Sequence, residues 1–242
     1  MLLWRRVRWL VLVQSSRIRP NPTASWLAFR QEKSVKEFRI VFWDFDGVIK
    51  ESVEVKTTAF KSLFATLGDD LVCRIGMHHE AHGGMSRFEK IPLYLQWGGL
   101  EPSPERVESY CRTFEGLVKQ AVIGSPWVPG VWDYLASNHA RQRFVLVTAT
   151  PQAEIEEILA TLGIASWFEK VFGAPVRKGE AIAVMLDRWR VSKEESVMVG
   201  DSTTDWEAAK QNDIAFVLRC TPLNVELQRR HKGKRLDDFR DE

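Results

Sequence analysis

Asp44 and Asp46 stand on either side of Phe45, directly after an apolar segment at residues 40–43 and directly before Gly47. Because side chains alternate along an extended chain, both carboxylates point the same way. Two like charges this close repel each other unless a cation neutralises them, and carboxylate oxygens suit Mg²⁺. Gly47 lets the backbone turn sharply after the pair. The spacing therefore indicates a divalent-cation site at a strand end, with a solvated Asx turn as the alternative.

Further polar residues follow apolar segments later in the chain. Thr148 and Ala149 lie beside a helix start, where a hydroxyl and backbone N–H groups can hold a phosphoryl oxygen. Lys178 precedes a helix and supplies a positive charge. Asp201 and Asp205 flank a polar turn that opens another helix. Each has an ordinary explanation as a helix cap or a surface charge, but their order and placement together favour a phosphate-handling site.

The elements that must position these residues alternate between apolar strands and amphipathic helices. Fully apolar strands separated by helices are typical of a parallel sheet covered on both faces. Ligands of such sheets bind at the carboxyl ends of the strands, where the polar residues above fall. We expect strands at 40–43, 144–147, 171–172, 196–199 and 215–218, and helices at 130–138, 152–162, 179–189 and 205–211.

Between the first strand and Pro129 the periodicity is helical and no strand is evident. Helices are expected at 52–67, 87–96 and 104–121, the last with Ser103 as N-cap and Pro104 at its first position. The fold class is therefore α/β with an inserted helical domain. The expected division is a basic extension at 1–38, a core formed by 39–55 and 128–242, and an all-helical insertion at 56–127.

Four motifs occur in a fixed order along the chain: Asp44-Phe-Asp46-Gly-Val, Thr148, Lys178 and Gly200-Asp201-Ser-Thr-Thr-Asp205. Because it has these four motifs in this order, the chain resembles the haloacid dehalogenase-like hydrolase superfamily over residues 39–228. The resemblance implies a Rossmann-like parallel sheet core. The helical insertion is similar to the small α-helical cap of the phosphoglycolate phosphatase and β-phosphoglucomutase branch.

The resemblance also implies catalytic roles. Asp44 would attack phosphorus and form an aspartyl-phosphate, and Asp46 would protonate the leaving oxygen and then activate water. That second role calls for a carboxyl whose pKa is raised by its acidic neighbours. Thr148, Ala149 and Lys178 would bind the phosphoryl oxygens, where positioning and electrostatics supply most of the catalysis.

A Mg²⁺ cofactor is implied in the same way. Its expected ligands are a carboxylate oxygen of Asp44, the backbone carbonyl of Asp46, and Asp201, with Asp205 assisting from nearby.

The insertion is expected to select the substrate. Its segment 83–87 is similar to the part of β-phosphoglucomutase-like caps that contacts the distal group of the substrate, so Arg87 and Lys90 are candidates for gripping an anionic substrate. Ordinary surface cations are the alternative. His78 and His82 would suit zinc if they lay one helical turn apart, but the H-E-x-x-H spacing is absent and a polar loop is preferred.

Composition narrows the class of protein. The 45% hydrophobic and 27% charged residues are ordinary for a globular protein, and the net charge of +2 hides an acid-free, six-arginine stretch at residues 1–31. The rest is mildly acidic and shows no basic track for nucleic acid.

Residues 1–38 suggest either an unstructured extension, a basic interfacial helix or an organellar transit peptide on an otherwise cytoplasmic protein. No membrane partner is expected for the core. Cys73, Cys111 and Cys220 are expected to be buried free thiols.

These features predict a Mg²⁺-dependent phosphatase whose partner is a small phosphorylated metabolite, a sugar or organic-acid phosphate. Two alternatives stay open at this point. One is a phosphomutase of the β-phosphoglucomutase type, whose cap would have to exclude water. The other is a non-catalytic relative that binds phosphate or a partner, although a pure binder has no need of the second carboxyl of the Asp44–Asp46 pair. The oligomeric state is not indicated.

Overall fold

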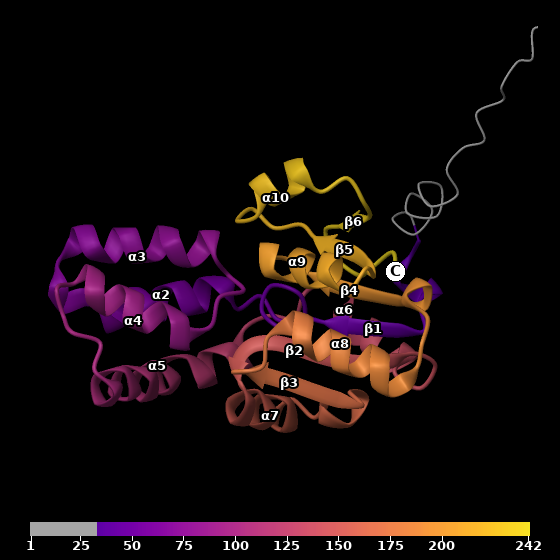
Figure 1. Ribbon diagram of the computed structural model, residues 1–242, viewed down its shortest axis with the longest axis horizontal. Helices are drawn as coiled ribbons and strands as arrows, with labels where there is room; N and C mark the ends of the chain where they lie inside the picture. The colour runs from indigo at the N-terminus through magenta and orange to yellow at the C-terminus, as the bar shows by residue number, and fades with distance from the viewer. Residues whose placement is uncertain (1–32) are drawn as a thin grey trace, which may run out of the picture.

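Six parallel strands form the central sheet of the protein, which a computed structural model describes over residues 33–242 (Figure 1). The order of the strands is β3-β2-β1-β4-β5-β6, so β1 lies at the centre between β2 and β4. The strands are β1 (Ile40–Trp43), β2 (Arg143–Pro151), β3 (Lys170–Ala174), β4 (Ser196–Gly200), β5 (Ala215–Arg219) and β6 (Arg235–Leu236). The predicted parallel sheet is confirmed.

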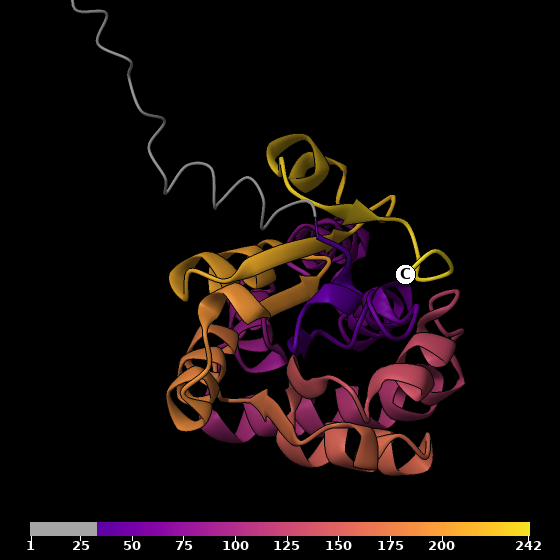
Figure 2. The ribbon, with the colours of Figure 1, turned by 90° about the vertical axis from the view of Figure 1, so that its right-hand side faces the viewer.

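Helices cover both faces of this sheet because its central strand is apolar on both sides. Ile40 and Phe42 face one hydrophobic cluster, while Val41 and Trp43 face another, and all four side chains are fully buried. The first cluster is completed by α8 (Lys178–Trp189), α9 (Thr203–Gln211) and α10 (Val225–Arg230), and the second by α6 (Val131–Asn138) and α7 (Gln152–Thr161). Figure 2 shows helices packed around the sheet, with the helical insertion behind it.

Four of the five α-helices between β1 and β2 lie together beyond one end of the sheet (Figure 1). They are α2 (Val53–Leu63), α3 (Asp69–Ala81), α4 (Arg87–Trp97) and α5 (Pro104–Gly124), and we call them the helical insertion. Local sequence sets their ends: Ser86 and Glu89 form a capping box on α4, and Ser103 caps α5 ahead of Pro104. Aromatic rings of Phe60, Tyr94 and Phe114 pack at its centre. The expected helices are present.

Short 3-10 helices link several of these elements. They are η1 (Val35–Glu37), η2 (Ala65–Leu67), η3 (Ala165–Trp167) and η4 (Lys193–Glu195). The single helix expected at 52–67 is thus α2 followed by η2, and Gly68 comes next with a φ of 103°. That left-handed conformation suits glycine because it has no Cβ.

The core begins earlier in the chain than residue 39. Val35 and Phe38 are buried in the same hydrophobic cluster as Trp43, and the Gln142 side-chain amide donates to the backbone carbonyls of both residues. Assigning residues 33–38 to a poorly ordered extension was therefore wrong. The prediction for the remainder of that extension, residues 1–32, lies outside the described residues. Across residues 33–242, no helix has both the length and the apolar character needed to cross a bilayer.

Two smaller expectations also need correction. His78 and His79 lie in the last turn of α3 and not in a polar loop, and the ring of His78 stacks on that of His82 with 4.1 Å between centroids. All three cysteines are free thiols, as expected, but none is fully buried: Cys73 is exposed, and Cys111 and Cys220 are half-buried.

Candidate active site

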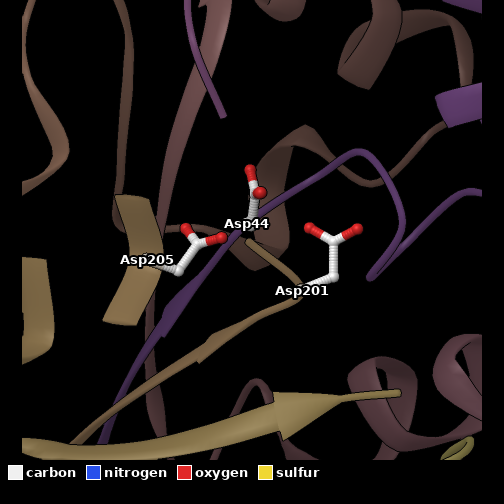
Figure 3. A group of neighbouring side chains, drawn as sticks. All are labelled: Asp44, Asp201 and Asp205. Carbon is white, nitrogen blue, oxygen red and sulfur yellow. The ribbon is translucent and has the colours of Figure 1, made fainter. Parts of the chain in front are cut away.

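Three carboxylates meet where β1 and β4 end (Figure 3). Asp44 directly follows β1, Asp201 directly follows β4, and Asp205 lies in the first turn of α9. One oxygen from each side chain lies within 4.8 Å of the others. Because β1 and β4 are parallel neighbours, their carboxyl ends bring Asp44 and Asp201 together. The structure thus joins residues that are more than a hundred positions apart in the sequence.

The Lys178 ammonium lies among these carboxylates. Its Nζ is 2.8 Å from Oδ2 of Asp44 and 2.6 Å from Oδ1 of Asp205, and the side chain is buried at the start of α8. Burial lowers the pKa of Lys178, but Asp205 and Asp44 outweigh it and hold the pKa above its usual value. Lys178 is therefore a permanently charged contact for anionic groups at this site.

One lysine does not balance three carboxylates. Burial and the charge of Asp205 raise the pKa of Asp44 to about 7, and burial together with Asp44 raises that of Asp201 well above its usual value. Part of each shift comes from the neighbouring carboxylates, because the site holds more negative than positive charge. A compact, oxygen-only donor set with such an excess fits a hard divalent cation such as Mg²⁺. Among the described residues, Asp44, Asp201 and Asp205 are the one group of His, Cys, Asp or Glu side chains with this clustering.

Asp46 lies in a different environment from Asp44. The hydroxyl of Ser52 donates to its Oδ1 at 2.6 Å, and its Oδ2 pairs with the ammonium of Lys56 and accepts from the hydroxyl of Thr150 at 3.3 Å. Burial raises the pKa of Asp46, but Lys56 and Ser52 more than offset it, so the pKa lies below its ordinary value. The expectation that acidic neighbours raise this pKa was wrong.

Thr150, Lys56 and Ser52 are the partners of Asp46 that sequence reasoning missed. Ser52 is the N-cap of α2, and the backbone N–H of Lys56 donates to the Ser52 carbonyl one turn earlier. Their spacing of four residues places both side chains on one face of a helix that begins directly after the first motif. That spacing is the feature of the sequence from which Ser52 and Lys56 could have been predicted to act together. Lys56 also donates to Thr150 at 2.8 Å and so links the helical insertion to β2.

Gly47 is required by the close approach of two strand ends. Its φ is 75°, and a Cβ built there would lie 2.2 Å from Oδ2 of Asp201. Any other residue would therefore be strained and would push Asp201 away from Asp44.

Thr148, Ala149 and Lys178 line a cavity of about 500 Å³ between the insertion and the core. The hydroxyl of Thr148 accepts from the backbone N–H of Thr150 at 3.2 Å, which leaves its own hydrogen free to donate. The segment of the insertion that closes this cavity packs tightly on the core, because a Cβ on Gly84 would lie 1.7 Å from Oγ1 of Thr204. The expected phosphoryl-binding residues thus share one cavity.

Arg87 and Lys90 are not in the lining of that cavity. The Arg87 guanidinium pairs with Glu154 of α7 at 2.7 Å, and both side chains are buried. The Lys90 ammonium is buried 2.6 Å from Nδ1 of His79. In this structure both cations therefore have protein partners, contrary to the expectation that they grip the substrate.

Comparison with known proteins bears on this arrangement. The family model described as haloacid dehalogenase-like hydrolase matches residues 41–218, which includes every motif residue from Asp44 to Asp205. The chain belongs to the haloacid dehalogenase-like hydrolase family. The predicted resemblance, and with it an enzyme of the hydrolase type, is confirmed.

Individual relatives agree with this assignment. A phosphoglycolate phosphatase of Vibrio cholerae is 27% identical over 187 residues, covering 73% of this chain and 81% of the relative. The solved structure of CbbY from Rhodobacter sphaeroides in complex with phosphate has a TM-score of 0.66 at 20% identity, covering 84% and 96% of the two chains. A β-phosphoglucomutase from Clostridium difficile has a TM-score of 0.66 at 17% identity, covering 84% and 92%. These solved structures share the fold. The name of the Vibrio cholerae relative agrees with the prediction of a phosphatase, and that of the Clostridium difficile structure is a mutase.

Proposed function

We propose that the protein is a Mg²⁺-dependent phosphatase that hydrolyses a small phosphorylated metabolite, a sugar or organic-acid phosphate, through an aspartyl-phosphate. The observation that carries this proposal is the position of the Asp44 carboxylate. It lies within ion-pair distance of Lys178 and within 4.8 Å of Asp201 and Asp205, beside a cavity lined by Thr148. A nucleophile, cationic charge for phosphoryl oxygens and a cation-binding set thus meet at one point.

Mg²⁺ would be held by Asp44, Asp201 and Asp205, together with the backbone carbonyl of Asp46. When bound, the ion would neutralise charge on the phosphoryl oxygens. It would also lower the pKa of Asp44, so that the nucleophile is ionised at neutral pH.

The chain's own residues account for the two half-reactions. In the first, an oxygen of Asp44 forms a bond to phosphorus, the ester bond breaks, and the leaving alkoxide takes a proton from Asp46. Lys178, Thr148 and the backbone N–H of Ala149 bind the equatorial oxygens. In the second, Asp46 takes a proton from water as it attacks phosphorus, and Asp44 is released with free phosphate.

Lys56 holds the carboxylate of Asp46 in a defined position for proton transfer. The ammonium of Lys56, with Ser52 and Thr150, fixes both oxygens of Asp46 and favours its ionised form. An ionised carboxylate is the form needed to accept a proton from water. We therefore propose that Lys56 orients Asp46 and supports the second half-reaction.

Turnover of p-nitrophenyl phosphate with Mg²⁺ tests the proposal. We expect release of free phosphate that stops on addition of a chelator and resumes with excess Mg²⁺. Asp44→Asn should lower kcat by roughly 10³-fold or more while the circular dichroism spectrum is unchanged. Isomer interconversion without phosphate release would indicate a mutase, and near-normal activity of Asp44→Asn would overturn the assignment of the nucleophile.

A further inference from the structure

The cavity lined by Thr148, Ala149 and Lys178, whose ammonium pairs with Asp44, has further lining residues, and we take the outer wall that they form as the place of the leaving group. This wall is formed by the start of α4 in the insertion and by α8 and α9 in the core. Apart from Lys178, its charged residues are two acids, Glu89 and Glu207, and one base, Arg177. The outer wall therefore has a formal charge of −1.

The single base lies close to an acid of the same wall. Arg177 is 3.8 Å from Glu89, and both side chains are largely exposed. The cations of the insertion that lie deeper have other partners, since Arg87 pairs with buried Glu154 and Lys90 contacts His79. A second anionic group on the substrate would thus meet a wall of net negative charge, whose one base already lies close to Glu89.

The remaining lining suits a neutral, hydroxylated group. Met85, Phe88 and Val176 offer apolar surface to C–H groups. The carboxylates of Glu89 and Glu207 can accept hydrogen bonds from hydroxyls, and the side chain of Gln211 can both donate and accept. This mixture of apolar surface and hydroxyl partners is the chemistry that binds a sugar or polyol.

Taking the proposed phosphatase activity as its basis, we infer that the substrate is a monophosphate with a neutral, sugar-like leaving group. Substrates that carry a second anion, a carboxylate or another phosphate, are disfavoured. Within the proposed substrate class, sugar phosphates are thus preferred over organic-acid phosphates, and monophosphates over bisphosphates.

Two matched substrate pairs test the inference with the full chain and saturating Mg²⁺. Sorbitol 6-phosphate and 6-phosphogluconate are both open chains that differ by a carboxylate at C1, and 2-hydroxyethyl phosphate and 2-phosphoglycolate differ in the same way. We expect kcat/KM to be higher for the neutral member of each pair by roughly tenfold, as one like-charge repulsion at a partly screened site predicts. Equal values, or a preference for the anionic members, would overturn the inference.

A double variant identifies the source of the discrimination. Glu89→Gln with Glu207→Gln removes both acids, and glutamine at position 89 still completes the capping box of α4. We expect this variant to raise kcat/KM for the anionic members and to reduce the ratio within each pair at least threefold. Glu226→Gln, which removes an exposed acid on α10, should leave the ratio unchanged. An unchanged ratio in the double variant would contradict the inference.

The assay separates this inference from the proposed function. If p-nitrophenyl phosphate and all four metabolites fail to react, the phosphatase proposal is wrong and the inference is overturned with it. If p-nitrophenyl phosphate is hydrolysed and 2-phosphoglycolate is the better metabolite, the phosphatase stands and only the inference fails.

Discussion

Asp44 and Asp46 are two residues apart, yet their pKa values are displaced in opposite directions. Asp44 shares its space with two carboxylates and one lysine, and burial with Asp205 raises its pKa to about 7. Burial acts on Asp46 as well, but the ammonium of Lys56 reverses its effect. Their positions along the extended chain do not explain these opposite pKa shifts, since side chains two residues apart point the same way. The difference arises because Lys56 and Asp205 come from different helices, α2 and α9.

Stability without metal should therefore depend on pH through Asp44. Its pKa is about 7 in the folded protein and 3.8 in the unfolded chain, so between these values the folded state binds the extra proton. The contribution of Asp44 to stability is consequently lost as pH rises through this window, by up to about 1.4 kcal/mol per pH unit, and does not change above it. Thermal or urea unfolding in chelator, from pH 4.5 to 8, measures this slope.

Asp44→Asn removes this titration, together with the part of the Asp201 shift that the charge of Asp44 causes. The variant should lose less stability than the wild type as pH rises, and the exposed control Asp70→Asn should behave as the wild type. Mg²⁺ at about a hundred times its Kd should restore about 2.7 kcal/mol to the wild type. Parallel curves for the wild type and Asp44→Asn would contradict the assigned pKa.

Lys56 is expected to matter for catalysis through Asp46 alone. Lys56→Met would leave the Asp46 carboxylate buried without its ammonium, so burial would then raise the pKa of Asp46. We expect kcat to fall by roughly tenfold to a hundredfold. Where hydrolysis of the aspartyl-phosphate limits kcat, the acid limb of the profile should also move to higher pH, because that half-reaction needs the ionised form of Asp46. Lys56→Arg keeps the charge and should retain the wild-type limb; an unmoved limb in Lys56→Met would exclude this role.

At the scale of elements, the interface between α4 and α7 depends on a buried ion pair. Arg87 and Glu154 are each almost completely buried, and the guanidinium also lies 4.6 Å from the ring of Phe114. Oε2 of Glu154 has no hydrogen-bond partner among the described residues. Such a pair contributes little net stability when intact, because burying both charges is costly, but losing one partner leaves an uncompensated charge.

Arg87→Met should therefore destabilise the protein by about 3–5 kcal/mol, measured by urea unfolding. Arg87→Met with Glu154→Met should recover most of that loss, since neither charge remains. The exposed pair of Arg112 and Glu108 provides the control, and Arg112→Met should cost less than about 1 kcal/mol. Equal losses for the single and double variants at the buried site would show that packing, and not charge, holds this interface.

Periodicity in the sequence predicted the elements that bury a regular apolar stripe. It missed α3 because the buried face of that helix is formed by Ile75, Gly76 and His79, only one of which is a large apolar residue. The elements α10 and β6 are six and two residues long, too short for a period to be visible. Length and regularity of the buried face thus decide what sequence reasoning can find.

For the whole molecule, the residues at strand ends were predictable and the pairing of cations was not. Asp44 and Asp201 follow neighbouring strands, so a parallel sheet brings them together whatever the details of packing. The partners of Lys56, Arg87 and Lys90 depend on how the insertion docks on the core, which no local pattern encodes. The start of the core was missed for a similar reason, because Phe38 is buried by the distant Gln142 and by residues of the C-terminal segment.

The ends of the described chain are expected to stabilise each other. The hydroxyl of Ser34 and the backbone N–H of Val35 both donate to the carboxylate of Glu242. Phe38 is 1% exposed and belongs to the same hydrophobic cluster as Phe239. Phe38→Ala should therefore lower the free energy of unfolding by about 3–5 kcal/mol, which urea titration of the full chain measures. Leu117→Ala, at a side chain that is 44% exposed, should change it by no more than about 0.5 kcal/mol. Similar small losses in both variants would mean that residues 33–38 are not part of the core.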